Sequence, residues 1–95
     1  MTTPTLQTSS ERIKQRRSQM LIHSYLYYHK DTSIVSDHQW QHWANELTSL
    51  QTQHNHSIGF YDKAFNDWDG STGMHLPVDQ WIQRKAEQLL TYMNK

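Results

Sequence analysis

Residues 21–50 read LIHSYLYYHKDTSIVSDHQWQHWANELTSL, and this stretch predicts two helices joined by a short loop. Ser36 is a favoured residue for a helix N-cap, and Asp37 after it suits the positive end of the helix dipole. From Trp40 to Leu50, apolar residues recur at helical spacing. We therefore expect a helix over about residues 37–53, which pairs as a hairpin with the helix before the loop.

The helix before the loop is expected over about residues 11–29. No glycine or proline interrupts this range, and Thr8 with Glu11 forms a capping-box pattern at its start. From Met20 onward the helix is apolar on nearly every side, which is typical of a helix covered on two faces. Its second half should therefore be the central element of the fold.

The rest of the chain predicts two further helices. The aromatic residues from Phe60 to Trp68 share one helical arc before Gly70, which indicates a short helix over about residues 58–68. Pro77 suits the first position of a last helix over about residues 77–93. Residues 1–10 are polar and are expected to form a flexible leader. The predicted fold class is all-α, with four helices in a single domain over residues 11–95.

Composition narrows the class of protein. Nine basic residues balance nine acidic ones, so no overall charge draws the chain to nucleic acid or to a membrane. The absence of cysteine excludes a disulfide framework, a thiolate zinc site and a cysteine nucleophile. No apolar run approaches the roughly 18 residues of a membrane-spanning helix. We expect a cytoplasmic protein without membrane contact.

Metal and catalytic patterns are weak. His38 and His42 are spaced to share one ion, but they lie on a polar helix face and lack the glutamate of a zinc-protease helix, so a solvated face is favoured. Residues 67–73 have the composition of a calcium loop, yet the twelfth position from Asp67 is Val78, which cannot be a ligand. We expect no metal site, no cofactor and no enzyme activity.

Two charged surfaces are candidate partner sites. The first, which we call the basic ridge, has few acidic neighbours in the sequence and comprises Arg12, Lys14, Arg16 and Arg17. The second is the acidic turn of residues 67–73, with Asp67 and Asp69. Uncompensated charge steers protein association, whereas four cations are few for binding nucleic acid. The sequence therefore predicts a protein partner, and reversal of Arg16 and Arg17 to glutamate should abolish its binding without unfolding the chain.

Paired aromatic residues on the two hairpin helices have two interpretations. Tyr27, Tyr28, Trp40 and Trp43 are expected to face one another across the hairpin. They either form part of the core or border a partly open slot that can stack a flat ring.

Residues 12–50 resemble the N-terminal helical hairpin of bacterial NAD-dependent DNA ligases. The matching elements are Arg12-Ile13, Tyr27-Tyr28, Asp31, Val35-Ser36-Asp37, the ring at Trp40, and Glu46-Leu47. The resemblance implies a hairpin that closes over the nicotinamide mononucleotide half of NAD, with Tyr27, Tyr28, Asp37 and Trp40 as nucleotide-binding residues. Trp40 replaces a tyrosine of that family and Gln41 replaces an aspartate, while the adenylated lysine has no counterpart.

Over nearly its whole length the chain is also similar to small phage and prophage proteins described as ligase-like. The shared stretches are QMLIHSYLYYH, SDHQWQHWANEL and YDKAFNDWDGSTG. This similarity implies a phage accessory protein in the host cytosol that kept the hairpin without the enzyme. Two hypotheses follow. One is a non-catalytic protein that binds a host protein, as an inhibitor of an enzyme or of a defence system such as a CRISPR-type nuclease. The other is a nicotinamide-nucleotide binding module of weak affinity.

Overall fold

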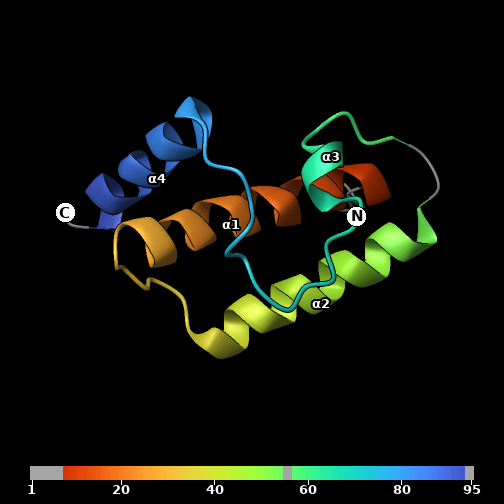
Figure 1. The fold of residues 1–95 in the computed structure, drawn as a ribbon, viewed down its shortest axis with the longest axis horizontal. Coiled ribbons are helices and arrows are strands. Elements are labelled where there is room, and N and C mark those ends of the chain that lie inside the picture. The colour runs from red at the N-terminus through yellow and green to blue at the C-terminus, as the bar shows by residue number, and fades with distance from the viewer. Residues whose placement is uncertain (1–7, 55–56, 94–95) are drawn as a thin grey trace, which may run out of the picture.

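A computed structural model describes residues 8–54 and 57–93 of the chain. These residues form four helices and no strand: α1 (Ser9–His29), α2 (Asp37–Gln53), α3 (Asp62–Phe65) and α4 (Gln80–Met93) (Figure 1). The predicted all-α fold class is confirmed. None of the described helices combines the length and the apolar character that crossing a membrane would require.

Helix α1 begins with the predicted capping box. Thr8 Oγ1 accepts a hydrogen bond from the Glu11 N–H at 3.2 Å, and the Glu11 carboxylate accepts one from the Thr8 N–H at 3.1 Å. This reciprocal pair fixes the helix start at Ser9, two residues before the predicted start. Ser9 and Ser10 are therefore helical and do not belong to the predicted leader. Residues 1–7 of that leader lie outside the described residues.

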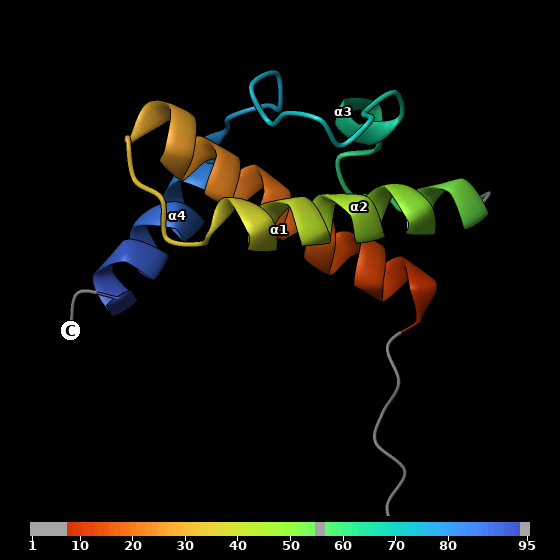
Figure 2. The same cartoon turned by 90° about the horizontal axis from the view of Figure 1, so that it is seen from below.

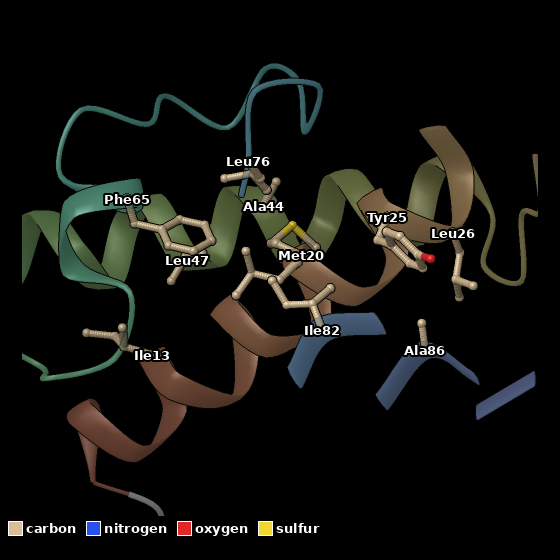
Figure 3. Packing of buried hydrophobic residues seen from close by; sticks show 11 residues of the cluster. Ile13, Met20, Tyr25, Leu26, Ala44, Leu47, Phe65, Leu76, Ile82 and Ala86 are labelled. Atoms are coloured by element: carbon tan, nitrogen blue, oxygen red, sulfur yellow. The ribbon is translucent and has the colours of Figure 1, made fainter. Parts of the chain in front are cut away.

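The second half of α1 is central, as its apolar surface predicts. Figures 1 and 2 show α1 between α2 and α4, which pack on different sides of it. Met20 of α1 is fully buried, together with Leu47 of α2, Phe65 of α3 and Ile82 of α4 (Figure 3). Because α1 supplies buried side chains to both neighbours, its weak amphipathic pattern reflects burial on two faces.

Helix α2 has the predicted bounds and the predicted cap. Ser36 Oγ accepts a hydrogen bond from the Gln39 N–H at 3.0 Å. In the loop before it, Asp31 has a φ of 50°, and the Thr32 N–H donates to the Leu26 carbonyl at 2.9 Å. The loop therefore folds back against the end of α1 and starts α2 beside it.

Helix α3 is a single turn, so the predicted helix over residues 58–68 is wrong at both ends. Gly59 and Tyr61 have φ values of 77° and 57°, which interrupt any helix before Asp62. The Asp62 carboxylate accepts hydrogen bonds from the backbone N–H groups of Ile58 at 3.1 Å and Gly59 at 2.9 Å. A side chain that bonds the preceding backbone in this way competes with helix formation.

Helix α4 begins at Gln80, three residues after the predicted start at Pro77. The Ile82 N–H donates to Asp79 Oδ1 at 2.8 Å, and the Gln83 N–H donates to the Asp79 carbonyl at 3.0 Å. Asp79 is therefore the cap, and the side-chain cap determines the helix start. Val78, which precedes this start, is exposed.

The segment between α3 and α4 runs along α2 and then crosses α1 (Figure 1). Gly70 has a φ of 83°, and a Cβ there would lie 3.1 Å from Thr48 Cγ2 of α2. A Cβ at Gly73 would lie 2.0 Å from Ser24 Oγ of α1. Two glycines thus permit a close approach of this segment to both hairpin helices, and the residues between them lie beside the hairpin.

Candidate functional site

A cavity of about 220 Å³ lies at the end of the hairpin where the loop joins α1 to α2. Four parts of the chain line it: α1, the loop, the first turns of α2, and the turn after α3. The lining residues are His23, Ser24, Tyr27, Tyr28, Ser33, Ile34, Val35, Asp37, Trp40, Gln41, Ser71 and Thr72. The site therefore combines both helices of the hairpin with a segment that is distant in sequence.

Aromatic side chains form the walls of the cavity. Tyr27 and Tyr28 are 54% and 41% exposed, and their rings meet edge to face with centroids 4.8 Å apart. Trp40 is half-buried, and its ring meets the ring of Trp68 at 6.1 Å. The two tyrosines are therefore not core residues, and the open-slot interpretation describes them better. Trp43 is not among the lining residues and packs instead against His23 with ring centroids 5.5 Å apart.

Two hydrogen bonds join the turn after α3 to the hairpin at the cavity. The hydroxyl groups of Tyr28 and Thr72 are 3.0 Å apart. Gln41 Nε2 donates to the Gly70 carbonyl at 3.2 Å and to Asn45 Oδ1 at 3.0 Å. Gln41 therefore anchors the turn that carries Ser71 and Thr72.

Asp37 and two buried polar groups set the electrostatics of the cavity. Within the part of the chain that the structure describes, His23 Nδ1 and Ser24 Oγ are buried and have no hydrogen-bond partner. Burial lowers the pKa of His23 below its usual value, so its imidazole is neutral at pH 7. Asp37 is thus the formally charged side chain of the lining. A buried polar atom without a partner costs about 1–3 kcal/mol, which favours a ligand that pairs with it.

The structure brings together all four nucleotide-binding candidates. Tyr27, Tyr28, Asp37 and Trp40 line the same cavity. The arrangement can stack a flat ring on aromatic faces and can accept hydrogen bonds from hydroxyl groups at a carboxylate.

Sequence reasoning missed other lining residues, among them His23, Ser24, Ser71 and Thr72. His23 and Ser24 precede Tyr27 and Tyr28 by four positions, so helical periodicity alone would have placed them on the same face of α1. Ser71 and Thr72 carry no comparable sequence signal. They reach the cavity through the tertiary packing of their turn.

The expectation of an uncompensated basic ridge is wrong. Glu46 of α2 accepts hydrogen bonds from Arg12 Nε at 2.6 Å and Arg16 Nε at 2.8 Å, and these bonds, with Arg12 first, lower the pKa of Glu46. Arg17 Nη1 pairs with Asp62 Oδ1 at 2.8 Å. Lys14 is exposed. Three of the four cations therefore have a carboxylate partner from another element.

Arg16 and Arg17 are in addition buried, with 7% and 4% of their surface exposed. Arg17 donates to Gln51 Oε1 at 2.8 Å and to the Phe60 carbonyl at 2.7 Å. It thereby joins α1 to α2 and to the chain before α3. Since these bonds hold the fold together, charge reversal at Arg16 and Arg17 would disrupt packing, and the predicted normally folded variant is not expected.

The two acidic residues of the turn lie apart from the cavity lining. The Asp69 carboxylate accepts hydrogen bonds from the Ser71 N–H at 2.9 Å and from Ser71 Oγ at 2.7 Å, which lower the pKa of Asp69. Asp67 is exposed. Asp69 therefore shapes the turn that carries Ser71. Among residues 8–54 and 57–93, no group of three or more His, Asp or Glu side chains is arranged to hold a metal ion.

The described residues form an α-helical hairpin with a cavity at its looped end. Residues 6–59 match the family described as "DNA ligase-like, N-terminal NAD+-binding domain", and since this is more than half of the chain, the chain belongs to that family. The DNA ligase of Stutzerimonas stutzeri (strain A1501) is 39% identical over 51 residues. These residues make up 54% of this chain and 6% of the ligase. No solved structure matches.

The resemblance of the hairpin to that of DNA ligases is thereby confirmed. The matched region takes in α1 and α2 but ends before α3, so Ser71 and Thr72 lie outside it. The cavity thus combines residues within the family match with residues beyond it.

Proposed function

We propose that this chain is a non-catalytic module that binds a nicotinamide nucleotide in the hairpin cavity. One observation carries the proposal: the four residues that the ligase resemblance names as nucleotide-binding line one cavity in this chain. The family match to an NAD+-binding domain supports the same ligand class.

The residues present fit the ring and ribose half of such a ligand. Tyr27, Tyr28 and Trp40 offer aromatic faces for a flat ring, and Trp40 keeps a stacking surface where the ligase family has tyrosine. Asp37 can accept hydrogen bonds from ribose hydroxyl groups. His23 and Ser24 supply the buried polar atoms that lack partners among the described residues.

The size of the cavity favours a small part of NAD. Its volume of about 220 Å³ is below the roughly 300–1,000 Å³ of pockets for drug-sized ligands. We therefore expect the nicotinamide and its ribose to enter while the rest of NAD stays outside. Affinity should be weak, because Asp37 is the charged group of the lining and Gln41 replaces the second acid of the ligase family.

Isothermal titration calorimetry with nicotinamide mononucleotide and NAD at millimolar concentration tests this proposal. The wild-type chain should release or absorb heat with both ligands, and Tyr27→Ala and Asp37→Ala should remove the signal. Lys14→Ala is the matched control, because Lys14 is exposed on the same helix as Tyr27 and does not line the cavity. Flat wild-type titrations at these concentrations would reject the proposal.

A second candidate function is the binding of a host protein, such as an enzyme or a nuclease-based defence system. Exposed apolar side chains favour it: Tyr27 and Tyr28 at the cavity, and Met74, which is 59% exposed. Tyrosines of this kind are frequent anchors of protein interfaces. Lys14, Asp67 and Asp69 are exposed as well and remain candidate contacts, whereas Arg16 and Arg17 are buried.

An affinity pull-down from host lysate tests the second candidate. A stoichiometric partner should be recovered with the wild-type chain and lost with Tyr27→Ala/Tyr28→Ala. Lys14→Glu and Asp67→Lys report separately on the charged surfaces. Recovery of the same partner with Tyr27→Ala/Tyr28→Ala would show that the partner does not bind through these two tyrosines.

A further inference from the structure

We propose that His23 and Ser24 recognise the primary carboxamide of the bound ring, so that the cavity selects nicotinamide compounds over those that carry a carboxylate. The inference rests on the proposed function, because it concerns the ligand of the same cavity. It assigns a specificity role to two residues that the family resemblance does not name.

The first argument is the unsatisfied hydrogen-bonding capacity of the two residues. Both line the cavity from consecutive positions of α1. Ser24 is only 4% exposed, yet neither its Oγ nor His23 Nδ1 has a partner in the described ranges. Buried side-chain polar atoms in folded proteins are mostly hydrogen-bonded. A ligand in this cavity would supply the missing partners.

The second argument is the position of the pair relative to the aromatic walls. His23 and Ser24 lie one helical turn before Tyr27 and Tyr28 on α1. A Cβ added to Gly73 would lie 2.0 Å from Ser24 Oγ. The backbone at Gly73 therefore covers Ser24 on the side of the turn. The pair and the two tyrosines thus line one cavity from successive turns of α1, within reach of the same small ligand.

The third argument is the chemistry of the two groups. A neutral imidazole has one donor and one acceptor, and a hydroxyl group can donate and accept, so together they match the NH₂ and the carbonyl of a primary amide. A carboxylate only accepts hydrogen bonds and carries a negative charge.

The charge of the cavity supports the same choice. Asp37 is a negative group in the lining that would repel a carboxylate on the ligand, and no lysine or arginine is among the lining residues to balance that carboxylate. His23 does not supply the missing cation, because it is packed against Trp43 with ring centroids 5.5 Å apart and its burial favours the neutral form.

The test is calorimetric titration of the full chain with nicotinamide mononucleotide and with nicotinic acid mononucleotide. The wild-type chain should bind the amide at least tenfold more tightly than the acid, which corresponds to about 1.4 kcal/mol. Ser24→Ala and His23→Phe should each reduce this ratio toward one. His23→Phe keeps an aromatic ring against Trp43, so it separates loss of the nitrogen from loss of packing. Free nicotinamide and NAD, as further titrants, distinguish the ring alone from the complete dinucleotide as the ligand source.

The outcomes separate this inference from the proposed function. If wild type binds both mononucleotides equally, the proposed function stands and carboxamide recognition is overturned. If the ratio is tenfold in wild type and survives in a variant that keeps its fold, the role of the residue replaced in that variant is overturned. If wild type binds neither compound, both proposals fail. Thermal melts show which variants keep their fold, and one folded variant is enough to overturn the assignment.

Discussion

Replacement of Gly73 by alanine should separate the turn after α3 from the hairpin. The new Cβ would lie 2.0 Å from Ser24 Oγ, 2.7 Å from Ser24 Cβ and 3.4 Å from Trp40 Cζ2. Non-bonded atoms settle at roughly 3.5 Å, so the turn and α1 must move apart by about 1.5 Å. Ser24 cannot yield easily, because it is buried on the central helix and its own Cβ is involved in the clash.

We expect Gly73→Ala to lower the free energy of unfolding by about 1–3 kcal/mol, the usual cost of overpacking. For a domain of this size, each kcal/mol lowers the melting temperature by roughly 4–8 °C, so a decrease of about 10 °C is expected. The same displacement should break the 3.0 Å contact between Tyr28 and Thr72. If the cavity binds nicotinamide mononucleotide, its affinity should fall roughly 3–10-fold, the effect of one lost hydrogen bond.

Thermal melts followed by circular dichroism, together with calorimetric titrations, measure both effects. Gly73 does not have a positive φ, so the cost of Gly73→Ala comes from the clash. Gly59→Ala is the opposite case, because Gly59 has a φ of 77° but an added Cβ there has no atom within 4 Å. The double variant Ser24→Gly/Gly73→Ala removes both clashing atoms of Ser24. It should therefore be less destabilised than the sum of the two single variants. A Gly73→Ala chain that melts like wild type would refute the close approach of the turn to α1.

Three further predictions concern stability. Arg17→Met removes the cation that faces Asp62 and should lower the free energy of unfolding, measured in urea, by about 2–3 kcal/mol. The loss is smaller than for a fully buried pair because the Asp62 side chain is 31% exposed. Lys14→Met, at an exposed position, should change the free energy of unfolding little. Hydrogen bonds from Ser57 first and from Arg17 next hold the pKa of Asp62 well below its unfolded value. This stabilisation is present above about pH 4 and is lost as pH falls below it, so the urea midpoint should decline with acid less steeply in Asp62→Asn than in wild type. Ser36→Ala should cost about 1 kcal/mol in thermal melts, and Ser36→Asp, which can still cap α2, should retain most of the stability.

Much of the hairpin could be predicted from the sequence because its signals are local. The Thr8–Glu11 capping box and the Ser36 cap each join groups three residues apart, so they can be recognised without knowledge of the fold. The apolar second half of α1 likewise indicated a helix covered on two sides. Where a local signal was absent or competed with another, the prediction failed: α3 and α4 start later because the carboxylates of Asp62 and Asp79 bond nearby backbone N–H groups.

Part of the candidate site could also be predicted from the sequence, and part depended on tertiary structure. The sequence alone placed Tyr27, Tyr28, Asp37 and Trp40 at the hairpin, but only the tertiary structure brought Ser71 and Thr72 to the same cavity.

The charges show the physical reason most clearly. A sequence gives the number of cations near Arg17 but not the groups that face them. Glu46 is 34 residues from Arg12, and Asp62 is 45 residues from Arg17. An ion pair and the burial of a side chain depend on distances in space, so only the folded chain decided that these arginines stabilise the hairpin.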